Sequence, residues 1–238
     1  MDTEKFEQYS FDSDYASGRI SLNQYISRTF AWMFLGLLVT FGLGWLMAAS
    51  GVVYYLFSIP AVLMILLALE LVVVLVLSAR IQKQSVNTSR VLFLSYALLN
   101  GLVFSAYFVA FEVGNLIAVF GLTALFFGAF ALYGRLTKAD LSRLRPFLIA
   151  GLIFLVLAGV LSLFINMSML ERGICMAGIV VFLCFTAYDT QKIKANFEYY
   201  SQDPELLRKA GIYSALQLYL DFINLLLYLL RFFGRSKD

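Results

Sequence analysis

Seven long apolar runs are the feature that most constrains the fold of this chain. They cover approximately residues 29–49, 52–79, 91–111, 116–133, 146–165, 174–189 and 211–234. A helix of about 20 apolar residues is long enough to cross the hydrocarbon core of a bilayer. Of the 238 residues, 61% are hydrophobic and only 14% are charged, whereas soluble domains carry about 25% charged residues. We therefore expect an all-α integral membrane protein with seven transmembrane helices.

The connections between these runs alternate in charge. The loops after the second, fourth and sixth runs are rich in Lys and Arg, and the other connections are short and nearly free of them. The positive-inside rule places the N-terminus and the three basic loops in the cytoplasm. Seven crossings would put the C-terminus outside, although Arg231, Arg235 and Lys237 favour the inside. The last run is therefore either a full crossing, which its length of about 22 residues favours, or a re-entrant helix.

The remaining composition excludes several classes of function. Histidine is absent, which removes His-based metal sites and His-dependent catalytic triads. Cys175 and Cys184 lie in one apolar run, where we expect them to pack as small residues without forming a disulfide. No phosphate-binding loop, EF-hand or dinucleotide fingerprint occurs in the sequence, so we expect neither an enzyme nor a bound cofactor. Residues 1–20 are polar and predict a mobile tail, and residues 21–238 predict a single transmembrane domain.

The last apolar run carries an aspartate, Asp221, near its middle. An ionisable group at that depth costs at least about 2.5–3.5 kcal/mol on insertion scales, so it is expected to face protein or a water-filled path. At about 100° per residue, one stripe of the helix collects the polar residues: Tyr213, Gln217, Asp221, Asn224, Tyr228 and Arg231. We expect this helix to be the centre of the bundle, with six helices around it. Gln217 and Asn224 are equally well explained as helix–helix hydrogen-bonding residues.

Three further charged residues lie in or beside the apolar runs: Glu70, Arg80 and Asp189. An ion pair with Arg231 is the simplest explanation of Glu70, and an interfacial position is the simplest explanation of Arg80 and Asp189. Two acids on neighbouring helices, however, share a proton and titrate in two separated steps. Two carboxylates are also hard oxygen ligands suited to Ca²⁺, with carbonyls, waters or Asn224 needed to complete the coordination. Competition between protons and Ca²⁺ would make ion passage depend on pH.

Two segments resemble the signatures of the Bax inhibitor family, the transmembrane Bax-inhibitor-motif proteins, in their bacterial form. They are AYDTQKI at residues 187–193 and LYLDFINLLLYLLRFFG at residues 218–234. The resemblance covers most of the chain beyond residue 20, including LELVVVLVLSAR, and it implies seven helices with six around the last. It also implies that Asp189 and Asp221 form a hydrogen-bonded pair that senses pH and that Arg80 is a latch on this pair. Glu70 and Arg231 would make supporting polar contacts.

The resemblance leads to two hypotheses about function. The first is a pH-sensitive leak channel or exchanger for Ca²⁺ in the bacterial inner membrane, with the lipid bilayer, Ca²⁺ and protons as its partners and with no role for nucleic acid. The second is an interaction protein that restrains a membrane-bound protease or modulates another membrane protein. A third, an intramembrane aspartyl protease, fits poorly. Leu218, Tyr219 and Leu220 precede Asp221 where a Gly-rich lead is expected, and the Pro-Ala-Leu signature of such proteases is absent.

Overall fold

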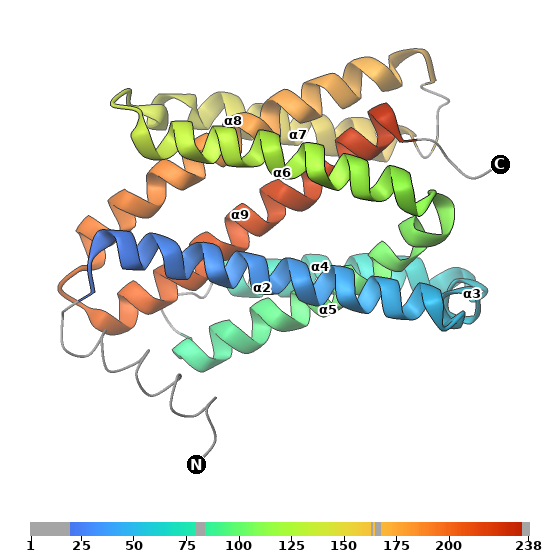
Figure 1. Ribbon diagram of the computed structural model, residues 1–238, viewed down its shortest axis with the longest axis horizontal. Coiled ribbons are helices and arrows are strands. Elements are labelled where there is room, and N and C mark those ends of the chain that lie inside the picture. Colours follow the sequence, from blue (N-terminus) through green and yellow to red (C-terminus); the bar gives the residue numbers. More distant parts are fainter. Residues whose placement is uncertain (1–19, 80–83, 163, 165–167, 235–238) are drawn as a thin grey trace. The chain divides into compact units, whose positions relative to one another are not determined.

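The computed structural model describes residues 20–79, 84–162, 164 and 168–234, and in this part of the chain the helices are joined by short loops and turns, with no strand (Figure 1). The helices are α2 (Leu22–Ala49), α3 (Val52–Phe57), α4 (Pro60–Ala79), α5 (Val86–Ala110), α6 (Val113–Leu136), the 3₁₀ helix η1 (Leu141–Leu144), α7 (Arg145–Ser162), α8 (Ser168–Tyr200) and α9 (Pro204–Phe233). The predicted tail, apart from Ile20, lies outside the described residues, and so does Arg80.

Six segments of the described chain are long and apolar enough to cross a membrane: α2, α5, α6, α7 together with η1, α8 and α9. The chain is therefore an integral, multi-pass membrane protein. Helix α4 has 20 residues and corresponds to the second predicted run, but it is not among the six, so the count of seven stays a prediction. In α9, 56% of the residues in its 18-residue apolar stretch are buried, against 17–33% of the residues in the corresponding stretches of the other five segments. Helix α9 is thus the most enclosed of these spans, although the ring of six helices around it also stays a prediction.

The second apolar run is divided into two helices. Gly51, with φ of 74°, adopts the left-handed conformation in the turn that precedes α3, and glycine adopts this conformation without steric cost. Pro60 is the first residue of α4, where its missing N–H would have no intrahelical partner in any case. The break between α3 and α4 therefore falls where proline is best tolerated.

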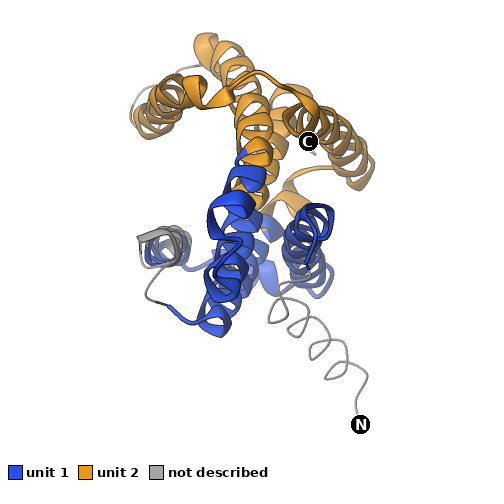
Figure 2. Cartoon of the chain, turned by 90° about the vertical axis from the view of Figure 1, so that its left-hand side faces the viewer, with its two compact units in different colours: residues 1–105, 192–216 blue, residues 106–191, 217–238 orange. Residues whose placement is uncertain are grey.

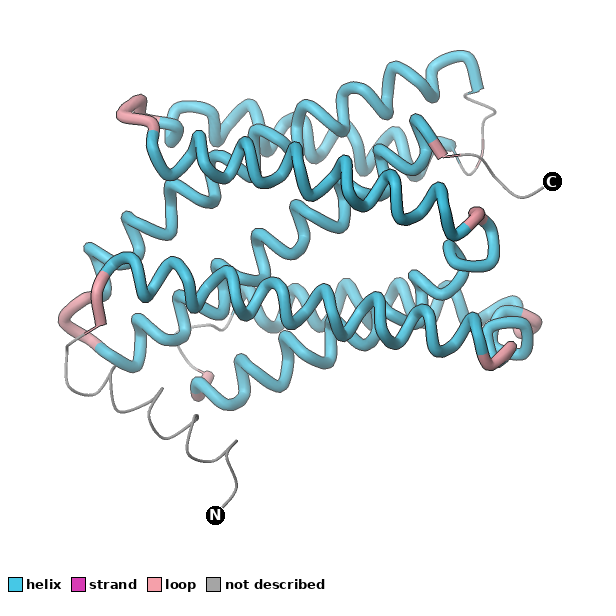
Figure 3. The backbone as a smooth tube through the Cα atoms, viewed as in Figure 1, coloured by secondary structure: helices cyan, strands magenta, loops and turns pink. Residues whose placement is uncertain are grey.

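The prediction that residues 190–210, between the sixth and seventh apolar runs, form a long loop is wrong. Helix α8 continues to Tyr200 and α9 begins at Pro204, so only residues 201–203 connect them, as the loop segments of Figure 3 show. Asp203 accepts hydrogen bonds from the backbone N–H groups of Glu205 and Leu206, at 3.0 and 2.9 Å, and so caps α9. Hydropathy marked only the apolar part of each helix, whereas the backbone hydrogen bonds of a helix continue through polar sequence.

Helices α8 and α9 contribute to both of the compact units into which the chain divides (Figure 2). Unit 1 comprises residues 1–105 and 192–216, and unit 2 comprises residues 106–191 and 217–238. In unit 1, the hydroxyl of Thr40 on α2 donates to the carbonyl oxygen of Ala97 on α5 at 2.9 Å. In unit 2, the ring of Phe222 on α9 packs against two phenylalanine rings of α6, those of Phe120 and Phe127, with both centroid distances 5.4 Å. The single transmembrane domain expected from the sequence stays a prediction.

Candidate functional site

The two predicted site acids are both buried within unit 2. Asp189 on α8 is 5% exposed and Asp221 on α9 is 4% exposed. One carboxylate oxygen of each, Oδ1 of Asp189 and Oδ2 of Asp221, is inaccessible to solvent. Because α8 runs on to Tyr200, Asp189 lies well inside a helix, and the interfacial explanation of this residue stays a prediction.

Contacts between α8 and α9 define how these two helices are aligned within unit 2. The short connection at residues 201–203 makes them an antiparallel helical hairpin. The rings of Phe182 on α8 and Tyr228 on α9 stack with a centroid distance of 5.9 Å. Gly178 lies against the same tyrosine, whose ring atoms would be 2.6 Å from a Cβ at this position. Tyr228 therefore packs against α8 at a position where the residue has no side chain.

The aspartates lie one heptad away from this stacked pair on both helices. Asp189 follows Phe182 by seven residues, and Asp221 precedes Tyr228 by seven. Seven residues are close to two helical turns, so in an antiparallel pair the residues one heptad along both helices again face each other. This register puts the two buried carboxyl groups on facing sides of α8 and α9.

The same register occurs in unit 1. There Asn196 on α8 donates through Nδ2 to the hydroxyl of Ser214 on α9, at 3.1 Å. Asn196 follows Asp189 by seven residues and Ser214 precedes Asp221 by seven. Sequence analysis did not identify Asn196 or Ser214, although the seven-residue spacing of polar positions on both helices was a signal that would have found them.

The segment of α8 that carries Asp189 is fixed by contacts on both sides of this residue. A Cβ added to Gly134 of α6 would meet the backbone of Ala187, so α6 and α8 approach each other closely at this point. The side chain of Gln191 accepts a hydrogen bond from the N–H of Leu141 at 2.9 Å and donates one to the carbonyl of Ala139 at 2.8 Å. Two residues before and two residues after Asp189, α8 is therefore tied to α6 or to the segment that follows it. Neither Gly134 nor Gln191 was identified from the sequence.

The other residues of the polar stripe on α9 differ from Asp221 in exposure. Gln217 and Asn224 are half-buried, and Arg231 is exposed. Asn224 donates through Nδ2 to the carbonyl of Leu220, at 2.8 Å, which is a bond within its own helix. Its amide nitrogen is therefore used locally, and its side-chain oxygen is the atom suited to a cation. Asp221 is the most deeply buried polar group of the stripe.

The remaining predicted site residues are Glu70, Arg231 and Arg80, the last of which lies outside the described residues. Glu70 on α4 is half-buried in unit 1, with Oε1 inaccessible to solvent, whereas Arg231 belongs to unit 2. Their ion pair stays a prediction, and so does the latch role of Arg80. In the part of the chain that the structure describes, no three His, Cys, Asp or Glu side chains gather as metal ligands.

Comparison with known proteins identifies the family. The family model described as "Inhibitor of apoptosis-promoting Bax1" matches residues 22–238. The chain belongs to the Bax inhibitor family. It is 40% identical over 221 residues to the protein named "Inner membrane protein YbhL" of Escherichia coli K12, which covers 92% of this chain and 94% of that protein.

Two more distant bacteria have similar proteins. A Deinococcus radiodurans protein is 37% identical over 215 residues, covering 90% of this chain and 91% of the relative. A Borreliella burgdorferi protein is 32% identical over 217 residues, covering 91% and 94% respectively. The family predicted from the segments at residues 187–193 and 218–234 is therefore confirmed.

Proposed function

We propose that this Bax inhibitor family protein is a pH-sensitive cation leak in which protons and Ca²⁺ compete for Asp189 and Asp221. The observation that supports the proposal is the burial of both carboxyl groups together with the shared heptad register of their helices. The name of the Escherichia coli relative supports the inner membrane of a bacterial cell as the place of action.

The chemistry follows from burying two like charges side by side. With both groups ionised, their repulsion is weakly screened, and either a shared proton or a divalent cation relieves it. A proton and a Ca²⁺ ion are therefore alternative occupants of the pair. Occupancy by the cation falls as the pH falls, because the proton concentration rises while the number of carboxylates is fixed.

Weak coordination suits ion passage better than ion storage. A storage site for Ca²⁺ supplies about six to eight oxygen ligands, whereas two carboxylates provide at most about four. An ion that conducts must bind well enough to enter and weakly enough to leave. The paired aspartates, with the side-chain oxygen of Asn224 and water as further ligands, meet this requirement.

Arg80 completes the proposed mechanism as the group that holds the path closed. A guanidinium stays charged at every accessible pH, so it pairs with the carboxylates whenever they are ionised and no cation is bound. Protonation of the pair weakens this contact. Neutralising the arginine in Arg80→Gln is expected to raise the basal flux.

The decisive experiment measures Ca²⁺ flux in proteoliposomes of the full chain across a pH series. Flux through the wild type is expected to vary with pH, whereas Asp189→Asn and Asp221→Asn are expected to give profiles that no longer depend on pH. Glu171→Gln is the matched control, because Glu171 is an exposed acid on the first turn of α8. Equal flux at every pH in the wild type and in Asp221→Asn would contradict the proposal. Peptide cleavage that Asp189→Ala abolishes would point instead to a protease.

A further inference from the structure

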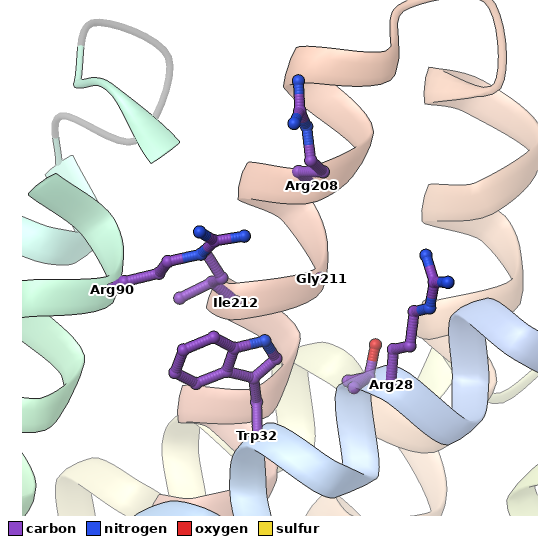
Figure 4. Close-up of a pocket in the computed structure, with 7 residues that line it drawn as sticks. Arg28, Trp32, Arg90, Arg208, Gly211 and Ile212 are labelled. Carbon is purple, nitrogen blue, oxygen red and sulfur yellow. The ribbon is translucent and has the colours of Figure 1, made fainter. Parts of the chain in front are cut away.

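Three arginines line one pocket in unit 1, apart from the aspartate pair. The pocket is formed by Arg28, Thr29, Trp32, Arg90, Arg208, Gly211 and Ile212, and its free interior volume is only about 10 Å³, so a group larger than a water molecule would bind at its open mouth. The arginines come from three helices, α2, α5 and α9, and Figure 4 shows Trp32 next to Arg90, with the side chain of Arg208 pointing away from both. Residues separated by more than 100 positions in the sequence thus supply one positively charged hollow.

The guanidinium groups are partly buried and two of them are oriented by local contacts. Arg28, Arg90 and Arg208 are all half-buried. The guanidinium carbon of Arg90 lies 5.7 Å from the ring centroid of Trp32, within the range of a cation–π interaction. Nε of Arg208 donates to the carbonyl of Pro204 at 3.3 Å. Contacts of this kind orient the planar groups before any ligand arrives, which lowers the entropy lost on binding.

The pocket lies near the starts of its three helices. Arg28 is the seventh residue of α2, and Arg90 and Arg208 are the fifth residues of α5 and α9. The long apolar segments begin just beyond these positions, and Trp is enriched where a membrane span meets water. A residue at such a boundary would lie level with the headgroup phosphates of the bilayer.

We propose that this pocket is a phosphate site that takes the headgroup of an anionic phospholipid. Arginine is suited to the role because its fork of N–H donors binds two phosphate oxygens at once. The positive-inside pattern of the chain places the pocket on the cytoplasmic face, where anionic lipids attract basic groups. Inorganic phosphate offers the same chemistry, so the test separates a lipid headgroup from a free phosphate. The site is independent of the proposed ion path.

The fluorescence of Trp32 reports occupancy directly. The chain contains two tryptophans, and Trp45→Phe removes the other one, which is 59% exposed. The full-length single-tryptophan protein in detergent is titrated with short-chain phosphatidylglycerol, with short-chain phosphatidylcholine and with inorganic phosphate. Phosphatidylglycerol is expected to shift the emission of Trp32 at far lower concentration than phosphatidylcholine, and raised ionic strength is expected to weaken its binding.

Substitution of the arginines tests the assignment. Arg90→Gln and Arg208→Gln are each expected to weaken phosphatidylglycerol binding about tenfold to hundredfold, and Arg90→Lys less. Arg172→Gln, at an exposed arginine near the start of α8, is expected to bind as the parent does. A response to inorganic phosphate with equal affinity would support the phosphate site and assign it to a free phosphate. Binding that is unchanged in both Gln variants, or that is insensitive to salt in the wild type, would overturn the proposal.

Discussion

The aspartate pair in unit 2 and the arginine pocket in unit 1 differ in how far their charged groups are buried. Asp189 and Asp221 are 5% and 4% exposed, whereas the three arginines of the pocket are half-buried near the ends of their helices. The carboxyl groups lie along the facing sides of two antiparallel helices. The guanidinium groups surround a hollow that opens outward.

Because of this difference, we expect the two regions to respond to different solution conditions. A carboxyl group enclosed by protein escapes the penalty of a buried charge by taking up a proton or a cation, so its state depends on pH and on ion concentration. An arginine keeps its charge at every accessible pH, so its ligand binding depends mainly on salt and on the charge of the ligand. We therefore expect pH to control ion flux, and ionic strength to control lipid binding, with little cross-effect.

The largest expected effect is the loss of pH-dependent flux when either carboxylate of the pair is removed. If Asp189 and Asp221 act as one titrating unit, the double variant with Asp189→Asn and Asp221→Asn is expected to show the same loss of pH-dependent Ca²⁺ flux as either single variant. For one proton competing with one cation, the apparent Ca²⁺ affinity of the wild type changes by at most about tenfold per pH unit. Flux in proteoliposomes measures this. Additive losses of pH-dependent flux in the double variant would show that the two acids act separately. As a control, the response of Trp32 fluorescence to phosphatidylglycerol should be the same in the aspartate variants as in the parent protein.

A smaller effect is expected at the close approach of α6 and α8. The Cβ introduced by Gly134→Ala would meet the backbone of Ala187, and a backbone cannot rotate away as a side chain does. We expect a loss of about 1–3 kcal/mol in stability, measured by thermal unfolding in detergent. We also expect altered flux, because Asp189 lies two residues beyond Ala187 on α8.

Gly128→Ala on the same helix as Gly134 is the control. A Cβ there meets nothing within 4 Å, so this variant should gain up to about 1 kcal/mol. Equal stability of both variants would contradict the close approach.

The smallest effect is expected at Asp140, an acid of the segment between α6 and α7. Hydrogen bonds from the hydroxyl and the backbone N–H of Ser142 hold the pKa of this carboxyl below its usual value. The stability contributed by these bonds is present above the pKa of the unfolded chain, and is lost only as the pH falls through the lower folded pKa. Asp140→Asn should therefore leave the pH profile of flux between about pH 5 and pH 8 unchanged. A displaced flux profile in this variant would show that an exposed acid contributes to the response.

Several features of the fold followed from the sequence because each depends on local composition. Apolar length and a high apolar content marked the membrane-spanning helices, whereas the division of the run at residues 52–79 into α3 and α4 was not predicted. The end of α8 was mispredicted because hydropathy measures affinity for the bilayer and not helix formation. The residues from Thr190 to Tyr200 are polar enough to leave the membrane, yet they remain helical.

By itself, the sequence determined that this is a multi-pass helical membrane protein of the Bax inhibitor family and that Asp221 occupies an apolar helix, since side-chain chemistry and apolar length carry this information. The tertiary structure decided which groups meet. The stacking of Phe182 on Tyr228 sets the register of Asp189 relative to Asp221, and the packing of α2, α5 and α9 brings Arg28, Arg90, Arg208 and Trp32 to the lining of one pocket. Such meetings depend on how whole helices pack against one another, which apolar length and side-chain chemistry along one segment do not determine.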